Sequence, residues 1–401
     1  MQRCDALARH SELAGGLTRV FLSPEQRAAN ELALGWMREA GMEAKLDAIG
    51  NVAGRYEGER PGLACLMLGS HLDTVRNAGR YDGMLGVVTA IECVHSLNQE
   101  GIRLPFALEV IGFGDEEGVR FGTTLLGSRA VAGNFDFNVL KAKDAKGITM
   151  EQALRDFGLR PENIDQVKRN KADVLAYAEL HIEQGPVLEA EGLPLGVVTA
   201  INGFSRLRFA LAGTAGHAGT VPMVLRRDAL AAAAECVLAI EQIGRAFLDL
   251  VATVGKIEAL PGAINVIPGD VAFTVDVRSP KDETRIWAAK EIRAAVTEIC
   301  RRRKIEAKAE DLQAQPVTAC APWLMAQMDA AVAAEGLQVR RLPSGAGHDG
   351  MAMHELADIA MLFVRCKAGI SHNPAEAISE ADAGAGARVL ERFIRNFFSR
   401  R

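Results

Sequence analysis

The sequence lacks the features that mark a membrane protein, a secreted protein or a nucleic-acid-binding protein. Its longest apolar runs, such as residues 63–68 and 229–240, are shorter than the roughly 20 residues that a membrane-spanning helix needs. No basic segment followed by an apolar block opens the chain, so we expect no secretory signal. The net charge of -5 and the pI of about 6.0 provide no basic surface for nucleic acid or an anionic membrane.

Cysteine is scarce and irregularly spaced. Seven cysteines, an odd number, are scattered from Cys4 to Cys366, and no two of them form a Cys-x-x-Cys pair. This distribution argues against a disulfide framework and against a zinc site built from thiolates. We therefore expect a cytoplasmic protein.

What is present is the composition of a globular protein with two domains. The 401 residues exceed one typical domain, and 49% of them are hydrophobic while 24% are charged. Residues 63–68 and 106–113 are continuous apolar runs, typical of strands covered on both faces of a sheet. Residues 86–97 between them have the length and period of a helix. This order of strand, helix and strand predicts an α/β domain with a sheet flanked by helices.

The pattern changes near residue 202. Two strands with alternating apolar and polar residues and two helices are predicted beyond it, at 206–213, 226–243, 271–279 and 283–304. We therefore predict a small α+β domain of residues 203–317, inserted into a larger α/β domain that is formed by residues 1–202 and 318–401.

Side chains suited to metal binding follow four of the predicted core strands. Because ligand sites of α/β sheets lie beyond the carboxyl ends of strands, we expect these side chains to meet. One such cluster has an ordinary explanation, because Asp, Asn and Gly are common turn formers, but four convergent clusters predict a metal site. The side chains are His71, Asp73 and Asp82, then Asp115, Glu116 and Glu117, then His181, Glu183 and Gln184, and finally His372.

The residue types favour two divalent metal ions. Zinc and similar ions take imidazole nitrogen and carboxylate oxygen, and catalytic sites keep positions open for water and substrate. Three histidines and two carboxylates can hold two ions at roughly 3.5 to 4 Å if one carboxylate bridges them. Zn, Mn, Co and Ni all accept such ligands, so the residues leave the metal open. One acid of residues 115–117 then remains to act as a general base.

Eight motifs occur together along the chain. They are GSHLDT, YDG, GDEEGVRFG, HIEQGP, GTAGHAGT, INVIPGDVAFTVDVRSP, SGAGHDG and GISHNPAE. In their order and spacing the chain resembles the hydantoinase/carbamoylase amidases, relatives of the zinc aminopeptidases and aminoacylases. This family includes allantoate amidohydrolases and N-carbamoyl-L-amino acid hydrolases. The resemblance covers nearly the whole chain and departs at Gly350, where the family pattern has alanine.

The resemblance implies a fold and a set of metal ligands. The fold is a metal-dependent aminopeptidase-like catalytic domain, a mixed sheet flanked by helices, with an inserted α+β domain for dimerisation and lid formation. Asp82 would bridge the two ions. His71 and His181 would complete one site with it, and Glu117 and His372 would complete the other.

The resemblance also implies the catalytic roles. Glu116 would take a proton from the attacking water and deliver it to the leaving nitrogen. Asp73 would orient the imidazole of His71, although a turn-forming aspartate is the ordinary alternative. His217 would face the carbonyl oxygen as it becomes an oxyanion.

Further residues would bind the substrate. Asn265 and Arg278 would bind its carboxylate, although from the residues alone a surface arginine at a strand end is the better explanation of Arg278. Gln184 suits the terminal amide of a carbamoyl group, and Gly347 and His348 would line the same pocket. Members of the family form homodimers through the inserted domain, which implies that His217, Asn265 and Arg278 complete the partner's site. The family also implies a cis peptide directly after Asp82.

Together these features predict a metal-dependent amidohydrolase. It would cleave the N-carbamoyl group of a small ureido acid, such as allantoate or an N-carbamoyl-L-amino acid, and release ammonia and carbon dioxide. A peptidase or aminoacylase of the same superfamily is an alternative that the HIEQGP motif disfavours. A non-catalytic binding protein on this scaffold is a second alternative, which the presence of Glu116 beside all five candidate ligands disfavours.

Overall fold

The computed structural model describes residues 1–400 and divides the chain into two compact units. The large unit consists of Met1–Ile201 and the chain from Ala319 onward, and the inserted unit is Asn202–Thr318. Each boundary lies one residue from the position expected from the change in sequence pattern. In the part of the chain that the structure describes, no helix has the length and apolar character required to cross a membrane.

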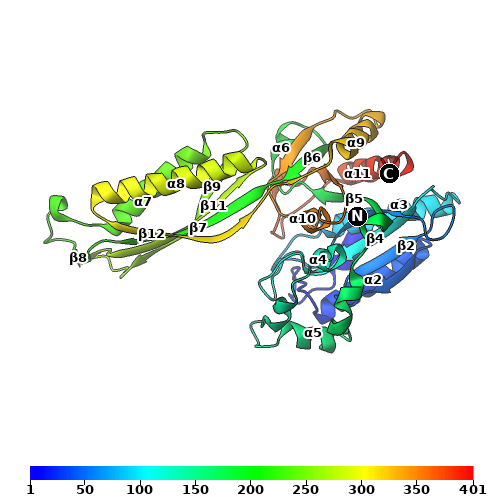
Figure 1. The fold of residues 1–401 in the computed structure, drawn as a ribbon, viewed down its shortest axis with the longest axis horizontal. Helices are drawn as coiled ribbons and strands as arrows, with labels where there is room; N and C mark the ends of the chain where they lie inside the picture. The colour runs from blue at the N-terminus through cyan, green and yellow to red at the C-terminus, as the bar shows by residue number, and fades with distance from the viewer. Residues whose placement is uncertain (401) are drawn as a thin grey trace. The chain divides into compact units, whose positions relative to one another are not determined.

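The large unit is built on a nine-stranded mixed sheet (Figure 1). The strand order is β1-β2-β4-β3-β5-β15-β6-β13, and β14 pairs with β6. Strands β3, β4, β5 and β15 are parallel to one another. Strand β2 is antiparallel to β4, and β6 is antiparallel to β15. The strands are β1 (Glu43–Leu46), β2 (Val52–Tyr56), β3 (Cys65–His71), β4 (Ala107–Phe113), β5 (Val174–Ile182), β6 (Leu195–Ile201), β13 (Thr318–Ala319), β14 (Arg341–Ser344) and β15 (Ile359–Val364).

Helices cover the sheet of the large unit. All seven residues of β3 and all seven of β4 are buried, so both faces of the sheet are covered at its centre. Helix α3 packs on β3, β4 and β5, α11 packs on α3 and β15, and α10 packs on α4 and β5. The helices are α1 (Gln2–Ala8), α2 (Pro24–Glu39), α3 (Met84–Gln99), α4 (Leu126–Ala132), α5 (Met150–Asp156), α6 (Val187–Ala190), α9 (Pro322–Ala334), α10 (Gly350–Met353) and α11 (Glu380–Arg395), with 3-10 turns η1 (Phe137–Lys141), η2 (Pro161–Val167), η3 (Lys171–Asp173) and η5 (Lys367–Gly369). The predicted α/β class with a mixed sheet flanked by helices is confirmed.

The start of α2 shows how the sequence sets one of these helices. The Ser23 hydroxyl accepts a hydrogen bond from the Gln26 backbone N–H at 3.1 Å, and Pro24 occupies the first helical position. The Gln26 side chain reaches back to the N–H of Leu22 at 2.5 Å. Two backbone donors at the helix start are thus satisfied by side chains, which is the purpose of a capping box.

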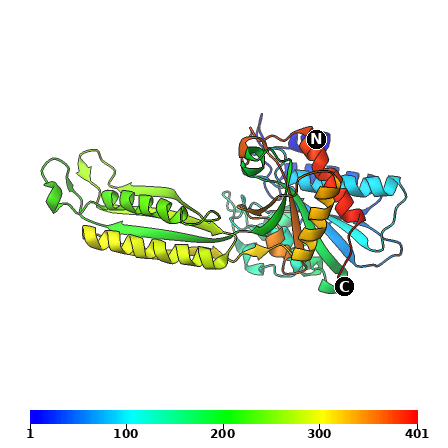
Figure 2. The same ribbon diagram turned by 90° about the horizontal axis from the view of Figure 1, so that it is seen from above.

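The inserted unit is a four-stranded antiparallel sheet with two helices along one face (Figures 1 and 2). Its strand order is β12-β7-β11-β9, and α7 and α8 pack on each other and on the sheet. Two of these strands, β9 and β12, were not predicted from the sequence. The elements are β7 (Gly203–Ala212), β8 (Gly216–His217), η4 (Met223–Leu225), α7 (Ala229–Gly244), β9 (Val251–Leu260), β10 (Val266–Ile267), β11 (Asp270–Ser279), α8 (Asp282–Arg303) and β12 (Glu306–Gln315).

The two ends of the inserted sheet are distinct. At the end we call the connecting end, Gly203 pairs with Ser279 beside the point where the chain passes between the units. At the opposite end, which we call the far end, Ala212 pairs with Asp270, and the short strands β8 and β10 follow.

Candidate metal centre

The predicted metal ligands gather at the carboxyl ends of the central parallel strands. His71 is the last residue of β3 and His181 is the second-last residue of β5. Glu117 lies in the turn after β4, and His372 lies in the loop that follows β15 and η5. Asp82 lies two residues before the start of α3. The parallel arrangement brings together residues that are up to 301 positions apart in the sequence, counting from 71 to 372.

Asp82 lies at the middle of the cluster and presents its two oxygens to different partners. Its Oδ1 is 3.4 Å from His71 Nε2 and 3.2 Å from His181 Nε2. Its Oδ2 is 3.3 Å from His372 Nε2, which is in turn 3.5 Å from Glu117 Oε1. One carboxylate therefore belongs to two groups of donors, and Asp82 is only 4% exposed.

These donors fit metal ions. Ligand atoms of His71, Asp82 and His181 lie within 4.8 Å of one another, and so do those of Asp82, Glu117 and His372. Both groups mix imidazole nitrogen with carboxylate oxygen, the donor set of zinc and related divalent ions. Two more groups meet the same criterion: His71, Glu116 and Glu117, and Glu179, His181 and His348.

Backbone carbonyl oxygens fix the orientation of the two buried imidazoles, His71 and His181. His71 Nδ1 is 3.1 Å from the backbone carbonyl oxygen of Asp73, and His181 Nδ1 is 2.9 Å from that of Ile182. Each ring therefore turns its Nε2 toward Asp82, as metal-ligating histidines usually require. The Asp73 carboxylate lies 3.7 Å from the same His71 nitrogen, and it accepts the N–H groups of Glu116 and Glu117 at 3.1 Å each. Asp73 thus contacts both the His71 ring and the turn that contains Glu116 and Glu117.

Burial sets the charge state of the acids in the turn after β4. Burial raises the pKa of Glu116 well above its ordinary range; the negative charge of Glu117 adds to this and His71 opposes it. Burial likewise raises the pKa of Glu117 to about 7. A carboxyl group with a raised pKa holds a proton more tightly than an ordinary glutamate does, which favours its action as a general base.

The backbone near the cluster is held in unusual conformations. Asp115, Gln184 and His372 have φ angles of 60°, 57° and 55°, in the left-handed region that non-glycine residues seldom occupy. Gly83 has φ of 69°, and a Cβ at this position would lie 2.5 Å from the His71 ring. Such conformations are typical of sites where the surrounding structure imposes the geometry. The expected cis peptide after Asp82 is wrong, because Leu260–Pro261 is the cis bond found among residues 1–400.

The candidate substrate residues of the large unit differ in their surroundings. Gln184 Nε2 donates to Asp82 Oδ2 at 2.8 Å, so this amide lies directly at the cluster. His348 is 1% exposed, and its Nε2 is 2.8 Å from the Ser344 hydroxyl. Its ring packs edge-on against His181, with 4.4 Å between ring centroids. The neighbouring Gly347 is exposed.

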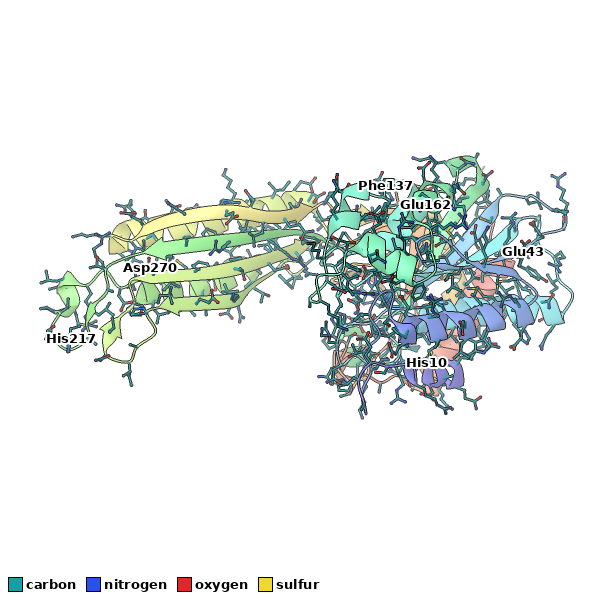
Figure 3. The ribbon with its side chains drawn as sticks, turned by 90° about the horizontal axis from the view of Figure 1, so that it is seen from below. His10, Glu43, Phe137, Glu162, His217 and Asp270 are labelled. Carbon is teal, nitrogen blue, oxygen red and sulfur yellow. The ribbon has the colours of Figure 1, made fainter. Side chains whose placement is uncertain are left out.

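The candidate residues of the inserted unit lie at opposite ends of its sheet. His217 lies in β8 at the far end, beyond Asp270 (Figure 3), and Asn265 is its neighbour, because the Asn265 carbonyl accepts the Ala218 N–H at 2.9 Å. Arg278 lies at the connecting end, where it pairs with Phe204.

The register of β11 gives the distance between these ends. The eight residue-to-residue steps from 270 to 278 span about 26 Å at roughly 3.3 Å per step. A single chain therefore cannot place His217 and Arg278 on the same small substrate. Arg278 also donates to the Asp276 carboxylate at 2.8 and 3.1 Å.

Three residues near the cluster were not predicted. Glu179, on β5 two residues before His181, is buried and accepts hydrogen bonds from Ser70 at 2.9 Å and Tyr177 at 3.0 Å. Ser371 and Glu376 flank His372 and contact the Asp82 segment. An acid inside an otherwise apolar strand is a signal that could have indicated Glu179, and Ser371 and Glu376 lie within the GISHNPAE motif, which could have indicated them.

Comparison with known proteins identifies the family of this chain. The peptidase family M20/M25/M40 matches residues 67–396. The chain belongs to this family. The M20/M25/M40 match includes all five residues of the two groups around Asp82.

Individual M20/M25/M40 relatives resemble the chain over nearly its full length. The N-carbamoyl-L-amino acid amidohydrolase of Geobacillus stearothermophilus is 42% identical over 379 residues, 94% of this chain and 92% of the relative. The allantoate deiminase of Arabidopsis thaliana is 40% identical over 424 residues, 98% and 81% of the two chains. The crystal structure of a hydantoinase/carbamoylase family amidase from Burkholderia multivorans has a TM-score of 0.92 at 34% identity and covers 98% of this chain and 95% of the other. The predicted resemblance to hydantoinase/carbamoylase amidases is confirmed, and so is the predicted class of hydrolase acting on linear amides.

Proposed function

We propose that the chain is a metal-dependent amidohydrolase that cleaves the N-carbamoyl group of a small ureido acid and releases ammonia and carbon dioxide. The single observation that carries this proposal is the position of Asp82, whose two oxygens face two separate groups of donors. A carboxylate in this position can bridge a pair of metal ions, an arrangement found in many hydrolytic sites. The activities named for the relatives, on N-carbamoyl amino acids and allantoate, support the substrate class.

Two divalent ions, Zn or Mn with Co and Ni as alternatives, would be held around Asp82. His71 and His181 would complete one site, and Glu117 and His372 would complete the other. Metal ions in such a site polarise the substrate carbonyl and lower the pKa of water toward roughly 7.

Glu116 would move the proton. Its raised pKa allows the carboxylate to accept a proton from the attacking water and to hold it until the nitrogen of the leaving group needs it. Asp73 would keep this turn in place, because its carboxylate binds the N–H groups of Glu116 and Glu117. Gln184 would bind the carbamoyl end of the substrate through its amide, and Gly347 and His348 would shape the wall beside it.

The far end and the connecting end of the inserted sheet could contact the same substrate molecule only if they came from two chains of a dimer. His217 and Asn265 at the far end would stabilise the oxyanion and bind a polar group, and Arg278 at the connecting end would bind the carboxylate. Because about 26 Å of strand separates the ends, one of them must act on the partner's substrate. We propose a homodimer formed through the inserted unit in which the far end crosses to the partner. The resemblance placed Arg278 at the partner's site together with His217, but the connecting end is joined covalently to the large unit of its own chain, so we propose instead that Arg278 serves its own chain.

The chain would work in the cytoplasm on a small molecule, without nucleic acid or membrane. All seven cysteines are free and buried, which suits a reducing compartment.

A substrate panel tests the proposed function. Metal-depleted protein is loaded separately with Zn, Mn, Co and Ni, and ammonia release is measured from allantoate, ureidoglycolate, N-carbamoyl-β-alanine and several N-carbamoyl-L-amino acids. The expected result is metal-dependent release from at least one of them. Hydrolysis of dipeptides or N-acetyl amino acids without ureido hydrolysis would favour the peptidase or aminoacylase alternative. Binding of ureido acids without turnover under any metal would favour a binding protein.

A further inference from the structure

Glu376 makes contacts that the proposed chemistry does not yet use. It is 4% exposed and lies four residues after His372. Its Oε1 accepts the backbone N–H of Tyr81 at 2.8 Å and that of Asp82 at 3.1 Å. These contacts join segments that are almost 300 residues apart in the sequence, so they form only when the C-terminal part of the large unit packs on the Asp82 loop.

A hydroxyl completes the connection between Glu376 and Asp82. Ser371 Oγ is 3.0 Å from Glu376 Oε2 and 2.7 Å from Asp82 Oδ2. One carboxylate thus holds the main chain of Asp82 directly and its side chain through Ser371. Because Asp82 Oδ2 also faces His372 at 3.3 Å, the same contacts fix the separation between two candidate ligands.

The neighbouring glycine shows how closely the two loops approach. A Cβ at Gly79 would lie 2.2 Å from Glu376 Cδ and 2.3 Å from its Oε1. Only a residue without a side chain allows the loop before Asp82 to close onto the carboxylate. The contact is therefore built from both sides, by an acid on one loop and a glycine on the other.

We propose that Glu376 is a positioning residue for the metal centre: it orients Asp82 and holds His372 at ligand distance, and so determines whether the group Asp82, Glu117 and His372 can bind its ion. The group His71, Asp82 and His181 depends on it less, because both of its imidazoles are fixed by backbone carbonyls of their own strands. This inference rests on the proposed function, since it assumes two bound ions.

Metal stoichiometry tests the inference without any assay of turnover. Wild type and variants are loaded with Co²⁺, dialysed, and analysed for metal per chain, and the visible spectrum of bound Co²⁺ is recorded during titration. Wild type should bind two equivalents. Glu376→Ala should retain one and bind the second at least about 10-fold more weakly, the usual range for loss of a group that orients a ligand. Gly79→Ala, which displaces Glu376 without removing it, should show the same selective loss.

Conservative and matched variants separate positioning from general stability. Glu376→Gln keeps an oxygen for the two N–H groups and should recover most of the second equivalent. Asp47→Ala is the control, because Asp47 is a half-buried acid outside the candidate site that accepts the N–H groups of Ile49 at 3.1 Å and Asn51 at 2.9 Å. This control should lower the melting temperature of metal-free protein as Glu376→Ala does, yet retain two equivalents.

The outcomes distinguish failure of the inference from failure of the proposed function. Two equivalents of unchanged affinity in Glu376→Ala would overturn the inference and leave the proposed function standing. Equal weakening of both equivalents, matched by Asp47→Ala, would also overturn it, because it would show a general loss of stability. Absence of bound metal in wild type would overturn the proposed function and the inference together.

Discussion

At the scale of the residue, a single carboxylate organises the candidate centre. Asp82 faces three imidazoles, and its neighbours differ in their distance from water: His71 and His181 are 2% and 1% exposed, whereas His372 is exposed. The group with His71 and His181 is therefore shielded, and the group with His372 is the more accessible. We expect accessible ligands to exchange their ion faster than shielded ones.

Replacement of Glu116 tests whether this residue acts as a general base or as a metal ligand. Glu116→Gln keeps the size of the side chain and leaves the five ligands around Asp82 unchanged. Turnover should fall by at least about 100-fold, because proton transfer by a positioned group typically contributes 10²- to 10⁴-fold. Metal per chain, measured by mass spectrometry of the dialysed protein, should stay at the wild-type value. Loss of metal together with activity would instead make Glu116 a ligand.

The raised pKa of Glu117 predicts a pH dependence of metal binding. Burial raises the pKa of Glu117 to about 7, above the ordinary range of a glutamate, so in metal-free protein the carboxyl carries a proton below pH 7. A ligand must lose that proton, so affinity for the ion bound by Glu117 should fall by at least about tenfold per pH unit below 7. Calorimetry in buffers of different ionisation enthalpy measures the protons released. A proton count that does not change between pH 6 and pH 8.5 would contradict this assignment.

Residue roles were predictable where the residue type carries the chemistry. Histidines and acids at strand ends indicated the candidate ligand positions, and the run of acids at 115–117 indicated the turn that contains Glu116. Ser371 and Glu376 were not predicted, because the role proposed for them depends on contacts with distant residues and not on their type. Asp73 was expected to orient His71, and it lies beside that ring with both its carbonyl oxygen, at 3.1 Å, and its carboxylate, at 3.7 Å.

At the scale of the element, burial on both faces decided which strands could be predicted. β3 and β4 are wholly buried and read as apolar runs, and β7 and β11 alternate because only one face of their sheet is covered. The edge strand β12 is exposed along nine of its ten residues, and β9 is also largely exposed. These two strands are held by backbone pairing with β7 and β11, which does not require apolar and polar residues to alternate. Their sequences therefore carry little of the pattern that identifies a strand.

The start of α3 offers a test of how an element positions a ligand. Gly83 precedes α3 with φ of 69°, and a methyl group there would strike the His71 ring at 2.5 Å. Gly83→Ala should lower the free energy of unfolding by about 1 to 3 kcal/mol through backbone strain and should also lose the ion held by His71. Denaturant titration of metal-free protein and metal analysis measure the two effects.

The other end of the same helix provides the control for that variant. Gly101 follows α3 with φ of 70°, and no heavy atom lies within 4 Å of the Cβ position. Gly101→Ala should therefore cost stability through strain alone and keep full metal content. If both variants keep their metal, contact between residue 83 and His71 does not govern the site.

At the scale of the whole molecule, the inserted sheet determines which residues one chain can bring to one substrate. Glu116→Gln, His217→Ala and Arg278→Ala homodimers should each be nearly inactive. After unfolding and reassembly in pairs, half of the dimers are mixed if association is random. Where two defects fall in the same site, the second site of each mixed dimer is intact, so activity should return to about a quarter of wild type.

The two pairings should give opposite results. Glu116→Gln with His217→Ala should recover activity, because the far end crosses to the partner in the proposed dimer. Glu116→Gln with Arg278→Ala should not, because the proposal has Arg278 serve its own chain. Ammonia release from verified mixed dimers is the measurement. Recovery in both pairings would require His217 and Arg278 to reach one substrate from the same chain, which the length of β11 forbids.

The position of β15 in the sheet has a consequence for biosynthesis. β15 lies between β5 and β6, yet it is made 158 residues after β6 ends, with the whole inserted unit in between. At roughly 5 to 20 residues per second, a ribosome takes about 8 to 32 s to cover that distance. During this time the facing edges of β5 and β6 have no strand between them, and unpaired edges readily join other chains. The nascent protein therefore exposes unpaired strand edges for a long interval, and His372, encoded later still, joins the other candidate ligands only after that interval ends.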